Sequence, residues 1–141
     1  YWNKKVYVWT AVLGESCKYA FNNDGMKAWN KLVGISNHIN PRKDSVRFVW
    51  KWDLEYQFFR IAVYVERDKE FKKTVYEIGT VLPGEQFKVV FDCFGGVTFA
   101  AINLSKPIRV PFRANNLTFR LNPYFGGRRK APHFMTLKLK S

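Results

Sequence analysis

The side chains of this sequence that could carry out acid–base chemistry are few and scattered. Hydrolysis of a glycosidic bond usually needs two carboxylates that face each other across the sugar. The closest pair of acids, Asp53 and Glu55, flanks Leu54 and is expected to lie in a turn between two strands. The two histidines, His38 and His133, have no neighbouring His, Cys or acid of the kind that a metal site or a catalytic triad shows. The sequence therefore predicts no hydrolase, no metal site and no cofactor.

A second chemistry that the residue types permit is β-elimination. Lyases that act on acidic polysaccharides can work with Tyr, His and Arg or Asn on a β-sandwich, without two carboxylates. The residues of these types that we consider are His38, Asn40, Arg47, Tyr64, Tyr124 and His133. Tyr and Arg are abundant throughout this chain, so their presence alone says little. We therefore rank a polysaccharide lyase behind two non-enzymatic hypotheses.

The strongest signal for a binding partner is charge. The sequence holds 24 Lys and Arg against 11 Asp and Glu, which gives a net charge of +13 and a pI of about 9.9. A positive surface of this size attracts anionic partners such as nucleic acid, an acidic glycan or an anionic membrane surface. The many aromatic rings could also stack on sugars or bases. The expected partner is a polyanion or a glycan.

The leading hypothesis is a non-enzymatic module that binds an acidic or neutral glycan through a basic and aromatic surface. The residues predicted to bind it are Trp29, His38, Arg47, Tyr124, Arg128, Arg129 and His133. The alternative is a structural jelly-roll subunit of a capsid or surface assembly, in which the basic face docks on acidic partners or nucleic acid. Such a subunit would be oligomeric.

The hydropathy pattern predicts an all-β fold. Aromatic and β-branched residues are enriched over helix formers, and short alternating segments are separated by Gly, Pro, Asn and Asp clusters. The expected strands cover residues 2–13, 18–21, 29–36, 45–53, 56–66, 71–82, 86–94, 97–104, 108–113, 117–122 and 134–140. About ten short antiparallel strands are most economically arranged as a jelly-roll-like sandwich, in one domain that covers residues 1–141.

Two of these strands have distinctive patterns. In the first, Val46, Phe48, Trp50 and Trp52 share one face, which we expect to be core, while the basic face opposite carries Arg47. The segment 56–66 is apolar at nearly every position, which predicts a central strand covered on both sides. Only residues 24–31 could form a helical turn.

The cysteines and the apolar runs limit the cellular setting. Cys17 and Cys93 could form one disulfide or remain two buried thiols. No apolar run approaches the roughly 20 residues that a membrane-spanning helix needs. Because the chain begins at Tyr1 rather than Met, we expect that other residues precede it. A secreted or surface location is favoured, and the compartment is otherwise unknown.

A string near the C-terminus carries a family resemblance. The residues Pro123-Tyr124-Phe125-Gly126-Gly127, followed by Ala131-Pro132-His133, resemble a signature of small uncharacterised bacterial β-sandwich proteins. Residues 30–36 and the strand at 45–50 are similar to earlier landmarks of that family. The resemblance implies a sandwich fold and a ligand site near Tyr124, Arg128 and His133, and it implies no activity. The family often has an acidic residue after the His, whereas this chain has Phe134.

Overall fold

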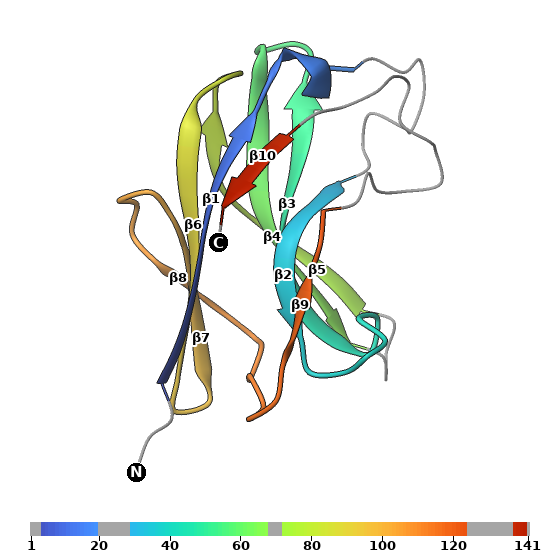
Figure 1. The fold of residues 1–141 in the computed structure, drawn as a ribbon, viewed down its shortest axis with the longest axis vertical. Helices are drawn as coiled ribbons and strands as arrows, with labels where there is room; N and C mark the ends of the chain where they lie inside the picture. The colour runs from blue at the N-terminus through green and yellow to red at the C-terminus, as the bar shows by residue number, and fades with distance from the viewer. Residues whose placement is uncertain (1–3, 20–28, 68–71, 124–136, 141) are drawn as a thin grey trace.

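The computed structural model describes residues 4–19, 29–67, 72–123 and 137–140. Within these ranges ten strands form two antiparallel five-stranded sheets that pack face to face (Figure 1). Sheet A has the order β10 (Leu137–Lys140), β1 (Lys4–Leu13), β6 (Gln86–Phe94), β7 (Val97–Ile102) and β8 (Ile108–Val110). Sheet B has the order β5 (Lys72–Val81), β4 (Phe58–Arg67), β3 (Asp44–Asp53), β2 (Asn30–Ser36) and β9 (Phe119–Leu121). The predicted all-β sandwich is confirmed.

The largest departure from the predicted elements lies after β1. Residues 18 and 19 are not in a strand, and a short 3-10 turn, Glu15–Cys17, precedes them. Tyr19 is buried and its ring packs edge-on against Trp50, with 6.1 Å between ring centroids. Aromatic packing against the core therefore fixes this segment without strand pairing. Of the predicted helical turn, residues 24–28 lie outside the described residues, and Lys31 belongs to β2.

Aromatic rings from both sheets fill the space between them. Phe48 of β3 and Phe91 of β6 are fully buried and stack with 4.1 Å between ring centroids. Trp9 of β1 meets both rings edge-on, at 6.4 Å from Phe48 and 6.0 Å from Phe91. The predicted inward face of β3 is confirmed, because Val46, Phe48, Trp50 and Trp52 all belong to this core.

The pairing of β3 with β4 determines which side chains share the opposite face. The two strands pair without a bulge from Asp44↔Arg67 to Asp53↔Phe58, so Arg47 lies directly opposite Tyr64. Successive side chains of a strand point to opposite faces. Arg47 and Tyr64 therefore face away from sheet A. As predicted, β4 is covered on both sides for most of its length, with residues 61–66 all buried.

Phe48→Ala should lower the free energy of unfolding by about 3–5 kcal/mol, because it leaves a cavity beside Phe91 that the surrounding rings cannot fill. Phe99→Ala is the control, since Phe99 lies on the outer face of sheet A and is 42% exposed. Urea unfolding followed by tryptophan fluorescence measures both variants. Equal losses of stability would show that the stacked pair is not central to the core.

Candidate functional site

The candidate site is the outer face of sheet B, defined as the side chains of β2 to β5 that point away from sheet A. Its described members are Lys31, Gly34, Arg47, Val49, Lys51, Asp53, Arg60, Ala62, Tyr64, Glu66, Val75 and Glu77. Three of them, Val49, Ala62 and Tyr64, form a small buried cluster that is separate from the main core. This face therefore combines charged groups with a buried apolar floor.

Arg47, Tyr64 and Glu66 form the most desolvated polar group on this face. Tyr64 is 6% exposed and Glu66 is 8% exposed. Glu66 lies near enough to Tyr64 for its charge to raise the pKa of the phenol. Directly opposite positions in an antiparallel pair have Cβ atoms about 5 Å apart, so the Arg47 guanidinium lies within reach of the phenol. The group thus brings a cation, a proton donor and a carboxylate together.

Burial dominates the electrostatics of this group. Desolvation and the Glu66 charge raise the pKa of Tyr64 to about 12, although the charges of Arg47 and Arg42 oppose the shift. Burial lowers the pKa of Arg47, and the charges of Glu66 and Tyr64 partly offset that effect. The Arg47 Nε is buried and has no hydrogen-bond acceptor among the described residues. The guanidinium is therefore desolvated at this atom without a compensating hydrogen bond from the described residues.

Gly34 gives the Arg47 side chain room to lie across β2. The two residues are paired in the β2–β3 register. A Cβ atom on Gly34 would lie 2.3 Å from the Val46 carbonyl oxygen and 2.9 Å from the Arg47 Cγ. Both distances are far below van der Waals contact, so any side chain at position 34 would displace the backbone of β3 and Arg47 with it. The glycine is a steric requirement of the site.

Two lysines and an aromatic ring extend the site along the sheet. Trp29, which precedes β2, packs against the buried cluster. The Lys51 Nζ lies 4.5 Å from the centroid of the Trp29 ring, and the Lys31 Nζ lies 5.0 Å from the centroid of the Tyr64 ring. Burial, with a smaller contribution from the charge of Arg60, lowers the pKa of Lys51. Both ammonium groups thus sit over rings on the same face as Arg47.

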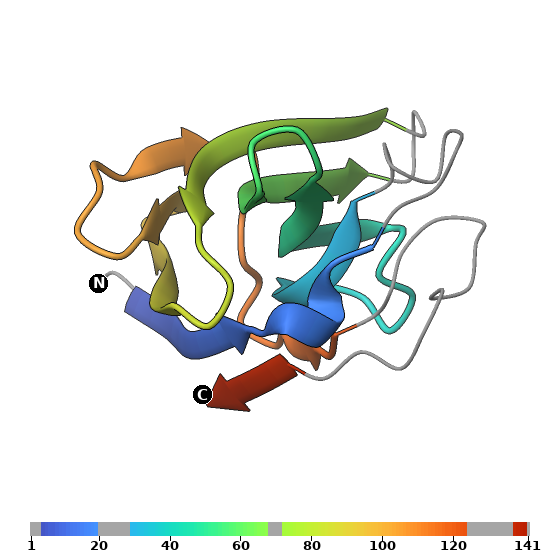
Figure 2. The same ribbon diagram turned by 90° about the horizontal axis from the view of Figure 1, so that it is seen from above.

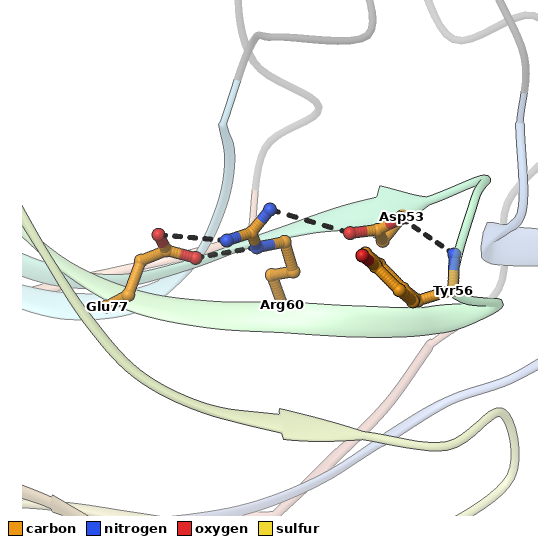
Figure 3. Close-up of polar contacts among 4 residues, drawn as sticks. All are labelled: Asp53, Tyr56, Arg60 and Glu77. Atoms are coloured by element: carbon orange, nitrogen blue, oxygen red, sulfur yellow. Dashed lines mark hydrogen bonds and ion pairs between the residues drawn. The ribbon is translucent and has the colours of Figure 1, made fainter.

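A network of ion pairs occupies the far end of the face. Figure 3 shows the Arg60 guanidinium between two carboxylates. Its Nε and a terminal nitrogen donate to the two oxygens of Glu77 at 2.6 and 3.1 Å, and its other terminal nitrogen lies 3.4 Å from Asp53 Oδ2. Asp53 Oδ1 accepts a 3.0 Å hydrogen bond from the Tyr56 backbone N–H. Asp53 therefore stabilises the β3–β4 turn, as the sequence predicts.

The structure brings together only part of the predicted ligand site. Trp29 and Arg47 share the outer face of sheet B, whereas His38 lies in the exposed loop between β2 and β3, where its Nδ1 accepts a 3.0 Å hydrogen bond from Asn40 N–H. The other four predicted residues, Tyr124, Arg128, Arg129 and His133, lie outside the described residues, as does most of the C-terminal signature.

Sequence reasoning missed three members of the site: Lys31, Lys51 and Glu66. Each of the three lies at an outward-facing position of its strand. The alternation of inward and outward residues in β2, β3 and β4, compared across the three strands, was the signal that could have found them. That signal required the strand register. The sequence alone did not supply the register, because β2 contains a bulge between Lys31 and Val33.

Cys17 and Cys93 are buried thiols and are not joined by a disulfide. Across the described residues, no group of three or more His, Cys, Asp or Glu side chains is arranged to hold a metal ion. In the same ranges, no helix is long and apolar enough to cross a membrane.

No protein-family model and no curated protein matches the sequence. Two solved structures match the fold. One is a polysaccharide lyase of family 18, with a TM-score of 0.57 and 11% identity over 86% of this chain. The other is an alginate lyase from Alteromonas sp. 272, with a TM-score of 0.58 and 9% identity over 98% of this chain. This chain spans 52% of the first structure and 72% of the second. At such identities the likeness establishes the sandwich fold.

These matches correct the leading hypothesis from the sequence. The prediction of a non-enzymatic glycan-binding module is wrong, because both matched sandwiches are lyases and favour the elimination alternative that we ranked third. The geometry gives a physical reason. The Trp29 ring, predicted as a sugar platform, instead packs on the sheet with Lys51 over it, while the half-buried Arg47 lies opposite Tyr64. Nothing in the comparisons supports an assembly subunit or a nucleic-acid partner.

Gly34→Ala should destabilise the fold by about 1–3 kcal/mol, because the added methyl group meets backbone atoms of β3. Gly14→Ala is the matched control, since a Cβ there has no atom within 4 Å and the backbone φ of −85° suits any residue. Thermal and urea unfolding of the two variants checks the difference. Equal stability of the variants would contradict the close approach of β2 and β3.

Tyr64 should make stability depend on alkaline pH. Its pKa of about 12 in the folded chain exceeds the usual value of about 10, so folding favours the protonated phenol. The resulting stabilisation is fully present below about pH 10 and is lost as the pH rises through the folded pKa. Wild type should therefore lose stability relative to Tyr64→Phe across this window, as measured by urea unfolding at a series of pH values. Parallel curves would place the Tyr64 phenol in water.

Proposed function

We propose that this chain is a lyase that cleaves an acidic, uronate-containing polysaccharide by β-elimination at the outer face of sheet B. The observation that carries the proposal is the cross-strand pair of Arg47 and Tyr64, which places a half-buried, partly desolvated guanidinium directly opposite a buried phenol. The fold shared with two polysaccharide lyases supports it. So does the net charge of +13, which suits a polyanionic substrate.

In this reaction the C5–H bond of a uronate breaks, the C4–C5 double bond forms, and the C4–O bond to the next sugar breaks. The C5 proton is acidic only when negative charge on the neighbouring carboxylate is neutralised. Arg47 is the group for this role, because its planar guanidinium matches a carboxylate and is already desolvated. Placed there, it stabilises the charge that develops on the carboxylate as the proton leaves.

Tyr64 is the residue suited to both proton transfers. As a phenolate it can take the C5 proton, and the resulting phenol can return that proton to the departing C4 oxygen. No cofactor is consumed in this sequence. Glu66 raises the pKa of Tyr64 and so favours the protonated phenol in the resting chain. Since Tyr64 is 6% exposed and the Lys31 ammonium lies over its ring, the lysine side chain moves aside when substrate binds.

The basic groups along the face are positioned to bind neighbouring sugars. Lys51 is the second outward residue of β3 after Arg47, and Lys31 of β2 lies opposite the intervening Val49. An acidic polysaccharide presents a carboxylate at regular intervals. Both lysines can form ion pairs with those carboxylates. Neutral polysaccharides offer neither these ion pairs nor an acidic C5–H, so they are not expected to be substrates.

Tyr64→Phe should abolish product formation while leaving polymer binding within about twofold of wild type, because it removes the proton carrier and keeps the ring. Alginate and polygalacturonate are the substrates to test, and the ultraviolet absorbance of the unsaturated uronate product is the readout. Tyr56→Phe is the matched control, since Tyr56 is 66% exposed. Arg47→Ala should weaken binding and turnover together, with partial rescue by Arg47→Lys.

The rate of the wild-type enzyme should rise with pH through the neutral range towards the pKa of Tyr64 at about 12, as the phenolate fraction grows. The profile is measured with the same absorbance assay, over the range in which circular dichroism shows a folded chain. A bell-shaped profile centred near neutrality would assign the base to another residue. No product from any acidic polysaccharide would refute the proposed function.

A further inference from the structure

A second basic site lies between the two sheets, away from the outer face of sheet B. Strands β5 and β8 are edge strands at the same side of the sandwich (Figure 2), and an open cavity of about 420 Å³ lies where they approach each other. Its lining includes Arg67, Arg109 and Arg113, and among the described residues that line it none is acidic. Arg109 is exposed and lies opposite Phe99 on the outer face of sheet A, so Arg67 and Arg113 are the two guanidinium groups that give the cavity a positive potential for an anion.

The cavity also has an apolar side. Tyr76, Val97 and Phe112 contribute to its lining. Phe112 is 3% exposed and anchors the wall in the core, and Tyr76 is partly buried on the inward face of β5, where it pairs with Val63. A cavity with aromatic walls and a few charged groups is the usual form of a site for a small organic ligand. The rings provide a surface against which a sugar or similar ring can pack.

Hydrogen bonds hold the Arg67 side chain and the Arg113 backbone in place before any ligand binds. The Arg67 guanidinium donates to the Pro111 carbonyl. The Asn37 side chain donates to the Arg113 carbonyl at 2.7 Å and accepts from the Asn115 backbone N–H at 2.8 Å, so it ties this segment to the β2–β3 loop. Such preorganisation reduces the entropic cost of binding.

The turn between β6 and β7 leaves room for the Arg113 guanidinium. Gly96 has a φ of +82°, and a Cβ there would lie 3.4 Å from the Arg113 Nε. The Arg113 side chain therefore passes close over the turn, beside Gly96 and Val97 of the cavity lining.

We infer that this cavity binds a small organic oxyanion, with its charged group held by Arg67 and Arg113 and its ring packed against Tyr76 and Phe112. This inference goes beyond the proposed lyase activity and does not depend on it. The cavity is on the inner side of sheet B, whereas Arg47 and Tyr64 are on its outer side. A sugar carboxylate and a sugar phosphate both have the required chemistry, so the experiment must separate them.

The test titrates the whole chain with glucuronate, a glucose phosphate ester and glucose, at constant ionic strength, and follows backbone amide signals by NMR. We expect one or both anions to shift the signals of Gly96, Val97 and Phe112, and glucose to have no effect. Whichever anion binds more tightly identifies the class of ligand. Failure of both anions to shift these signals would overturn the inference.

Arg113→Ala should weaken anion binding about tenfold, because it removes a charge-assisted hydrogen bond. Lys106→Ala is the matched control, since it removes one positive charge from an exposed loop residue outside the cavity lining. If Arg113→Ala unfolds, Arg113→Lys keeps the charge without the guanidinium fork and should still weaken binding. Equal affinities in the Arg113 and Lys106 variants would show nonspecific attraction and refute the site.

The same titration in Arg47→Ala separates this inference from the proposed function. Binding at the cavity should be unchanged in that variant, whether or not the chain is a lyase. Loss of binding in Arg47→Ala would show that the anion occupies the outer face of sheet B instead.

Discussion

Burial of alternate β3 side chains against sheet A is the constraint on which the rest of the structure depends. Phe48 stacks on Phe91 across the sandwich, and Trp9 closes the contact edge-on. A shift of one residue in the register of β3 would expose Phe48 and turn Arg47 into the core. The apolar packing thus fixes the position of every polar group on the outer face of sheet B, because the side chains alternate strictly from one face to the other.

The outer face of sheet B holds charged groups at a cost to stability. Burial of the Tyr64 phenol and partial burial of the Arg47 guanidinium remove both from water, which raises the pKa of Tyr64 and lowers the pKa of Arg47. A structural role would be served as well by apolar side chains of similar volume. Gly34 is a second sign that this face is sterically constrained. It leaves room for the Arg47 side chain, and any residue larger than glycine at position 34 would clash with β3. Desolvated groups of this kind are typical of active sites.

Strand β4 separates the two basic sites of the molecule. Tyr64 points outward to the candidate active site, whereas Arg67, at the end of the same strand, lines the cavity between the sheets. Both sites are held by side chains on strands or by loops hydrogen-bonded to them, so both are formed before a ligand arrives. The positive charge of the whole chain attracts anions to the molecule, and in the two proposals the local arrangement of arginines determines where they bind.

The sequence by itself determined the fold class, most strand positions and the two faces of β3. The alternation of apolar and polar residues along one strand is a local property, which can be recognised without knowing the neighbouring strands. It also indicated an anionic partner and named Arg47, Tyr64 and Trp29 as candidates. Only the tertiary structure decided which of them lie together. The pairing of Arg47 with Tyr64 depends on the β3–β4 register, and the cavity between β5 and β8 depends on how two edge strands meet. Both are contacts between residues distant in the chain, and local periodicity carries no information about such contacts.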